Sequence, residues 1–155
     1  MDQILMPQSL SKIYVHVVFS TKYRKELILD NVIQELHHYT AGILNNMECP
    51  SIQVGGVKDH IHILFVLSRT NTIAQIVEKV KTGTSKWIKT KGDGYKGFHW
   101  QSGYSAFSVS QSGIIQVTEY IQNQAQHHLK MTFQEEYRSL LLKYKISFNE
   151  EYVWD

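Results

Sequence analysis

The chain has few of the residues and segments that mark several protein classes. Among its 155 residues Cys49 is the one cysteine, which excludes an internal disulfide and a zinc site built from several cysteines. No apolar run approaches the roughly 20 residues needed to span a membrane. The first ten residues lack a basic start and a long apolar stretch, so no signal peptide is visible. We therefore expect a cytoplasmic protein with no membrane partner.

Neither sign of charge dominates the chain. Sixteen Lys and Arg oppose fourteen Asp and Glu, giving a net charge of +2, so binding to a polyanion must come from a local patch. The composition, 43% hydrophobic and 19% charged, is that of a globular protein. There are two prolines and no repeat or low-complexity linker. We expect one domain over residues 1–155, with a core at about 13–128 and a C-terminal extension at about 129–155.

Strand and helix patterns follow one another along the chain. Strands are predicted at 13–20, 51–57, 60–67 and 104–110, and helices at 26–46, 71–91, 113–128 and 132–145. Thr132 and Glu135 form a capping box for the last helix. The order β-α-β-β-α-β followed by two helices predicts an α+β fold of the ferredoxin-like, split β-α-β type, which is RRM-like. It has one antiparallel sheet with two helices on one face, and its first and third strands lie side by side in the middle.

Two histidines alternate on the third predicted strand. Residues two apart on a strand project from the same face, so His60 and His62 face one way while Ile61 and Ile63 turn toward the helices. Two imidazoles at this spacing can bind one metal ion. Two separately hydrogen-bonded histidines near the start of a strand explain the pattern as well.

A tyrosine and a glutamine share one face of the predicted helix at 113–128. Tyr120 and Gln124 are four residues apart, which brings their Cβ atoms within about 6 Å. A phenol beside an amide oxygen could be a nucleophile next to a metal ligand, and a surface Tyr–Gln pair is the alternative. His127 and His128 follow, and we interpret them as solvated residues at the helix end.

Basic residues accompany aromatic ones in three places. A groove lined by basic and aromatic side chains suits single-stranded nucleic acid. A solvated helix face explains the lysines equally well. The candidate DNA contacts are Lys22, Arg24, Lys25, Lys81, Lys86, Trp100 and Tyr104. His16 is a further candidate, because it faces away from Val15 and Val17 and can lie on the same side of the sheet as His60 and His62.

These motifs together resemble the small single-tyrosine HUH transposases of bacterial and archaeal insertion sequences, the IS-two-hundred-like family. His60-Ile61-His62, preceded by Asp59, is similar to the family's D-H-x-H motif. The opening VHVVFSTKYRKELI looks like its first strand and basic turn, and WQSGYSAFSVS resembles its W-S-x-S-Y strand. YIQNQ resembles the helix that carries its tyrosine and a metal-ligating glutamine. The likeness runs from about residue 14 to 124.

The resemblance implies a transposase that cleaves and rejoins single-stranded DNA, with Tyr120 attacking a backbone phosphorus to form a 5′-phosphotyrosine. It implies a divalent metal, Mg²⁺ or Mn²⁺, held by His60, His62 and Gln124. We expect Asp59 at most to contact one of these ligands, without binding the metal itself. The partners implied are DNA hairpins at the ends of an element and a second copy of the chain, in a homodimer whose tyrosine helices can complete composite active sites. A hairpin-binding relative that does not cleave is the alternative. We assign no site to the last 30 or so residues.

Overall fold

A four-stranded antiparallel sheet forms the centre of the protein in the computed structural model, which describes residues 7–155. The first six residues, part of the stretch in which no signal peptide was found, lie outside the described residues. The strands, in the order β2-β3-β1-β4, are β1 (Tyr14–Ser20), β2 (Ser51–Val57), β3 (His60–Val66) and β4 (Ser105–Val109). The first and third strands are therefore neighbours in the middle, as predicted.

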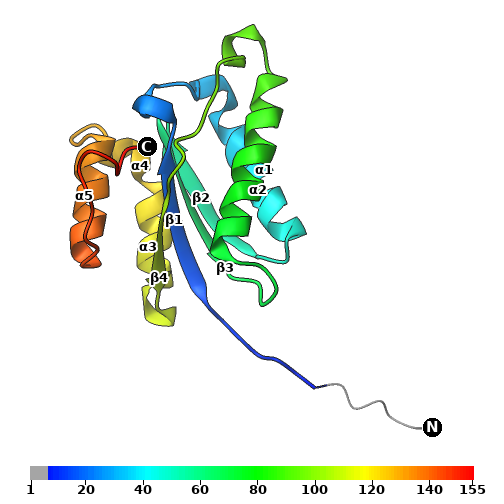
Figure 1. Ribbon diagram of the computed structural model, residues 1–155. Coiled ribbons are helices and arrows are strands. Elements are labelled where there is room, and N and C mark those ends of the chain that lie inside the picture. The colour runs from blue at the N-terminus through cyan, green and yellow to red at the C-terminus, as the bar shows by residue number, and fades with distance from the viewer. Residues whose placement is uncertain (1–6) are drawn as a thin grey trace.

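Helices cover both faces of this sheet (Figure 1). One face carries α1 (Asp30–Asn46) and α2 (Ile73–Lys89), the two crossover helices of the predicted fold. The other face carries α3 (Ile114–Gln122), α4 (Gln124–His127) and α5 (Phe133–Lys143). The α+β, split β-α-β prediction with additional C-terminal helices is confirmed.

The alternation of side chains along β1 produces two separate cores. Val15, Val17 and Phe19 pack beneath α1 and α2, in the larger core. Val18 faces the other way and packs with Phe107 of β4. On that side the core is completed by α5, through Phe133, Tyr137 and Leu141. All seven residues of β1 are buried, because a strand covered by helices on both sides presents neither face to water.

The first helix begins four residues later than predicted, at Asp30 instead of residue 26. The preceding residue Leu29 is extended, with φ −76° and ψ 155°. Ile28 is fully buried, and its N–H donates to the carbonyl of Lys58 at 3.0 Å. The apolar side chain of Ile28 thus joins the core from an extended segment, which the helical spacing could not distinguish from a first turn.

The predicted helix at 113–128 is broken at Asn123, which has φ −97° and ψ 19° between α3 and α4. The carbonyl of Tyr120 accepts a hydrogen bond from Nε2 of Gln124 at 3.5 Å. The break leaves Gln124 buried, with 1% of its surface exposed. Gly55 allows α3 to lie close to the sheet, because a Cβ there would stand 2.6 Å from the carbonyl oxygen of Ile121.

The last helix has one of the two bonds of its predicted capping box, since the side chain of Thr132 accepts from the N–H of Glu135 at 3.2 Å. The second bond, from the Thr132 N–H to the Glu135 side chain, is not formed. Oε1 of Glu135 accepts from the Thr132 hydroxyl at 3.3 Å instead. None of the helices in residues 7–155 is long and apolar enough to cross a membrane.

Candidate functional site

His60 and His62 of β3 lie side by side with their Nε2 atoms facing the same point. Both are fully buried. Nδ1 of His60 lies 2.6 Å from Oδ1 of Asp59, and Nδ1 of His62 lies 2.8 Å from Nε2 of His16. Because each Nδ1 is held by a neighbour, each ring presents its Nε2 to the helices on this side of the sheet.

A buried glutamate of α5 lies between these nitrogens. Oε1 of Glu136 is 3.2 Å from Nε2 of His60 and 3.0 Å from Nε2 of His62. It is also 3.1 Å from Nε2 of His128. The candidate ligand atoms of His60, His62 and Glu136 all lie within 4.8 Å of one another. Glu136, with 2% of its surface exposed, therefore bridges the histidine pair.

The sequence analysis missed Glu136, because it assigned no site to the C-terminal extension. One signal was available. Phe133, Tyr137 and Leu141 form the buried stripe of α5, and Glu136 lies on that stripe. An acidic residue on the apolar face of a helix requires a buried partner, since burying an unpaired charge is costly. That signal predicts a buried partner without identifying which one.

Tyr120 and Gln124 meet the same glutamate. The hydroxyl of Tyr120 donates to Oε2 of Glu136, and Nε2 of Gln124 donates to this oxygen at 2.9 Å. Oε1 of Gln124 lies 2.9 Å from Nε2 of His60. The Tyr120 ring lies 5.7 Å from the ring of His62, measured between centroids. The tyrosine, the glutamine and both histidines are thus brought together within one chain.

Burial and the shared carboxylate shift the protonation of the site. Burial opposes charge on His60, but hydrogen bonds to Asp59 and Glu136 raise the pKa of His60 to about 9. Burial likewise opposes charge on Glu136, but hydrogen bonds from His128, His60 and His62 hold the pKa of that carboxyl far below its ordinary value. Burial, and then the charge of Glu136, raise the pKa of the Tyr120 phenol. The site therefore contains an ionised carboxylate beside a neutral phenol.

The donor set suits a divalent cation. Two imidazole nitrogens, the Glu136 carboxylate and the amide oxygen of Gln124 converge, and no thiolate is among them. Carboxylate and amide oxygens are the ligands that Mg²⁺ and Mn²⁺ prefer, and imidazole is a common ligand of transition metals. Oε1 of Glu136 already contacts Nε2 of both His60 and His62, so these three atoms are close enough to share one cation.

Three of the predicted DNA contacts have polar atoms bonded to other protein groups. His16 is 2% exposed and lies against His62. Trp100 is 8% exposed, and its Nε1 donates to Oγ1 of Thr84 at 2.9 Å. Nζ of Lys81 donates to three carbonyls of residues 101–103 at 2.7, 3.1 and 2.8 Å. These bonds hold the three side chains against the protein, and their contact with DNA stays a prediction.

The other predicted DNA contacts lie at the surface. Lys25, Lys86 and Tyr104 are exposed, and Lys22 is half-buried. Arg24 is also half-buried, with its guanidinium 5.4 Å from the ring centre of Trp154. Their contact with DNA stays a prediction.

Solved structures resemble the fold of this chain. No curated protein matches the chain. A solved candidate transposase from Deinococcus radiodurans R1 is 21% identical with a TM-score of 0.60, covering 79% of this chain and 98% of its own. A REP-associated tyrosine transposase bound to a REP hairpin is 15% identical with a TM-score of 0.57, and the match covers 83% of this chain and 74% of the transposase. These two structures support the fold.

The family assignment comes from the sequence. The family described as "Transposase IS200 like" matches residues 9–124. That range includes the histidine pair and the tyrosine–glutamine pair, and it ends before Glu136. Because the match covers most of the chain, the protein belongs to the IS200-like transposase family.

Proposed function

We propose that the protein cleaves and rejoins single-stranded DNA by transesterification, with Tyr120 as the nucleophile. The observation that carries this proposal is the shared carboxylate. The Tyr120 hydroxyl and the Nε2 atoms of His60 and His62 all contact Glu136, so a nucleophile and a set of metal ligands meet at one point. Membership of a transposase family supports the same chemistry.

The proposed step conserves the phosphodiester. The Tyr120 oxygen forms a bond to a backbone phosphorus, and the bond from that phosphorus to the 3′ oxygen breaks. The phenol loses its proton, and the departing 3′ oxygen gains one. The products are a 5′-phosphotyrosine and a free 3′ hydroxyl, and attack by another 3′ hydroxyl reverses the step without ATP. Covalent catalysis of this kind is a known use of tyrosine.

Four side chains would hold the metal in this proposal: His60 and His62 through Nε2, and Gln124 and Glu136 through Oε1. When bound, Mg²⁺ or Mn²⁺ polarises the scissile phosphate and stabilises charge on the leaving oxygen. Asp59 contacts Nδ1 of His60 and His16 contacts Nδ1 of His62. These two contacts fix the orientation of the ligand rings.

Glu136 holds the nucleophile until the substrate arrives. The Tyr120 hydroxyl donates to Oε2 of Glu136. This hydrogen bond must break before the Tyr120 oxygen can attack phosphorus. Because Gln124 donates to the same oxygen, the carboxylate keeps a second partner when Tyr120 moves. The C-terminal helix is therefore part of the proposed catalytic site.

We infer that the substrate is a DNA hairpin flanked by single strands. The structural similarity to a tyrosine transposase bound to a REP hairpin supports this class of DNA. A homodimer remains part of the proposal. Tyr120 lies beside His62 of its own chain, with a distance of 5.7 Å between the ring centroids, which supports a site formed within one subunit.

The test is covalent capture. The protein is incubated with Mn²⁺ and a labelled pool of DNA hairpins flanked by randomised single strands, and the mixture is run on a denaturing gel. We expect a protein–DNA adduct that Tyr120→Phe abolishes without loss of DNA binding. Tyr152→Phe, at an exposed tyrosine of the C-terminal tail, should leave the adduct unchanged. An adduct that persists in Tyr120→Phe would refute the nucleophile, and a mobility shift with no adduct would indicate a hairpin-binding protein that does not cleave.

A further inference from the structure

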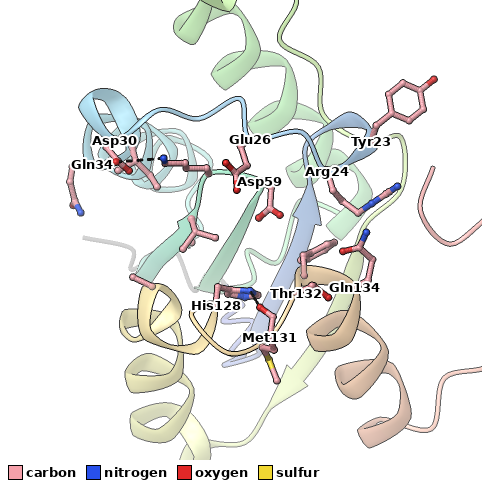
Figure 2. Close-up of a pocket in the computed structure, with 16 residues that line it drawn as sticks. Tyr23, Arg24, Glu26, Asp30, Gln34, Asp59, His128, Met131, Thr132 and Gln134 are labelled. Atoms are coloured by element: carbon pink, nitrogen blue, oxygen red, sulfur yellow. Dashed lines mark hydrogen bonds and ion pairs between the residues drawn. The ribbon is translucent and has the colours of Figure 1, made fainter.

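A pocket of about 670 Å³ opens beside His60 (Figure 2). Its walls come from residues 23–34, from the turn between β2 and β3, and from residues 125–134. Asp59 and His128 belong to this wall and also contact the candidate site, through His60 and Glu136 respectively. The volume is within the range of sites that bind small organic molecules.

This pocket offers a route to the buried donors. His60, His62, Gln124 and Glu136 are at most 2% exposed, so a substrate needs an opening next to them. The rings of His128 and Phe133 line the pocket, and their centroids lie 4.5 and 4.6 Å from that of His60. One layer of side chains therefore separates the pocket from the site.

The charge of the pocket favours a nucleobase over a phosphate. Its wall carries three carboxylates, on Glu26, Asp30 and Asp59, against the cations Arg24 and Lys58. With three carboxylates against two cations, the wall has no surplus of positive charge that would attract a phosphate. Carboxylates accept hydrogen bonds from the amino groups of bases, and proteins read unpaired bases through these edges.

Among these carboxylates, Glu26 is the one with neither oxygen bonded to a residue in the described range. Asp30 forms an ion pair with Lys58 at 3.7 Å, and Oδ1 of Asp59 is held by His60. Glu26 makes no side-chain hydrogen bond or ion pair with any residue in the described range 7–155. Figure 2 shows the carboxylates of Glu26 and Asp59 directed into the same open region.

The position of Tyr120 indicates which nucleotide occupies the pocket. Tyr120 does not line it, and its ring packs against His62 and His127 with centroid distances of 5.7 and 5.0 Å. In an in-line displacement the entering and leaving oxygens stand on opposite sides of phosphorus. With the phenol on the His62 side, the leaving 3′ oxygen and its nucleoside point toward the His60 side, where the pocket is.

We propose that this pocket binds the unpaired base on the 5′ side of the cut and that Glu26 accepts a hydrogen bond from its exocyclic amino group. The inference rests on the proposed function, since it uses the direction of attack by Tyr120. Thymine is the DNA base without an exocyclic amino group, so it is the poorest occupant. Glu26 is therefore a specificity-determining residue.

The test measures binding without cleavage. The probes are four fluorescein-labelled hexanucleotides, each with five thymidines followed by dA, dC, dG or dT at a free 3′ hydroxyl end. Fluorescence anisotropy is measured with the full-length protein in Mn²⁺. We expect the three amino-bearing ends to bind at least about tenfold more tightly than dT, the discrimination of a good side chain–base contact. Glu26→Ala should remove this difference and leave the affinity for the dT end unchanged.

A matched variant separates base reading from general charge. Glu78→Ala removes an exposed carboxylate from α2, a helix that does not line the pocket, and should keep the preference. Equal binding of all four probes, no binding of any, or a preference that survives Glu26→Ala would overturn the inference. The covalent adduct of Tyr120 is scored separately, so a protein that forms the adduct without a base preference refutes the pocket assignment and leaves the proposed function standing.

Discussion

Replacing Glu136 by glutamine tests the donor set most sharply. The amide keeps the size of the side chain and removes the one carboxylate among the four proposed metal ligands. Substitution of residues that merely support a metal ligand weakens binding about 10- to 100-fold, so loss of a charged ligand should reach at least the upper value. We therefore expect the dissociation constant for Mn²⁺ to rise about 100-fold in Glu136→Gln.

The stability conferred by the metal gives the readout. At a free Mn²⁺ concentration of about 100 times the wild-type dissociation constant, binding stabilises the folded state by about 2.7 kcal/mol. The same concentration would stabilise Glu136→Gln by only about 0.4 kcal/mol. For a chain of this size the difference corresponds to about 5–9 °C in the Tm shift caused by Mn²⁺.

The assay is differential scanning fluorimetry over a Mn²⁺ titration. Glu135→Gln is the matched control, because Glu135 is exposed on the same helix. It should keep the wild-type shift. If Glu136→Gln gains as much stability from Mn²⁺ as the wild type, the carboxylate is not a ligand and the reasoning is refuted.

Three further predictions concern residues outside the cluster of proposed metal ligands. Lys81→Ala should lower the free energy of unfolding by about 1–3 kcal/mol in urea titrations, because carbonyls of residues 101–103 lose their donor; unchanged stability would mean that these bonds do not stabilise the fold. Lys25→Ala should reduce the log–log salt slope of single-stranded DNA binding by about 0.7, and an unchanged slope would mean that Lys25 touches no phosphate. Thr132→Ala should cost about 1 kcal/mol of stability through loss of the α5 cap, measured by thermal unfolding, and no loss would contradict the capping contact.

The patterns of the sequence predicted the fold, and they named each side chain of the candidate site except Glu136. Period-two alternation predicted β1 and β3 as strands, and it predicted that His60 and His62 share a face. Helical spacing brought Tyr120 and Gln124 together, and the break at Asn123 did not separate them. These relations depend on residues close in the sequence, where backbone geometry fixes the direction of side chains.

Contacts between distant segments were beyond such patterns. Glu136 lies 74 residues from His62 in the sequence, and nothing in the periodicity of α5 indicates which strand it packs against. Lys81 and Trp100 carry the signature of a nucleic-acid surface, but their polar atoms are bonded to protein groups. Residue type could not show this, because amphipathic side chains can face water or protein.

The central claim, that Tyr120 forms the bond to DNA beside this cluster, is tested most directly by tandem mass spectrometry of the wild-type protein after reaction with hairpin DNA and Mn²⁺. The account predicts a nucleotide phosphate on the peptide that contains Tyr120, together with a DNA fragment ending in a 3′ hydroxyl. Cleaved DNA carrying a free 5′ phosphate, or a phosphate attached to any other residue, would contradict it.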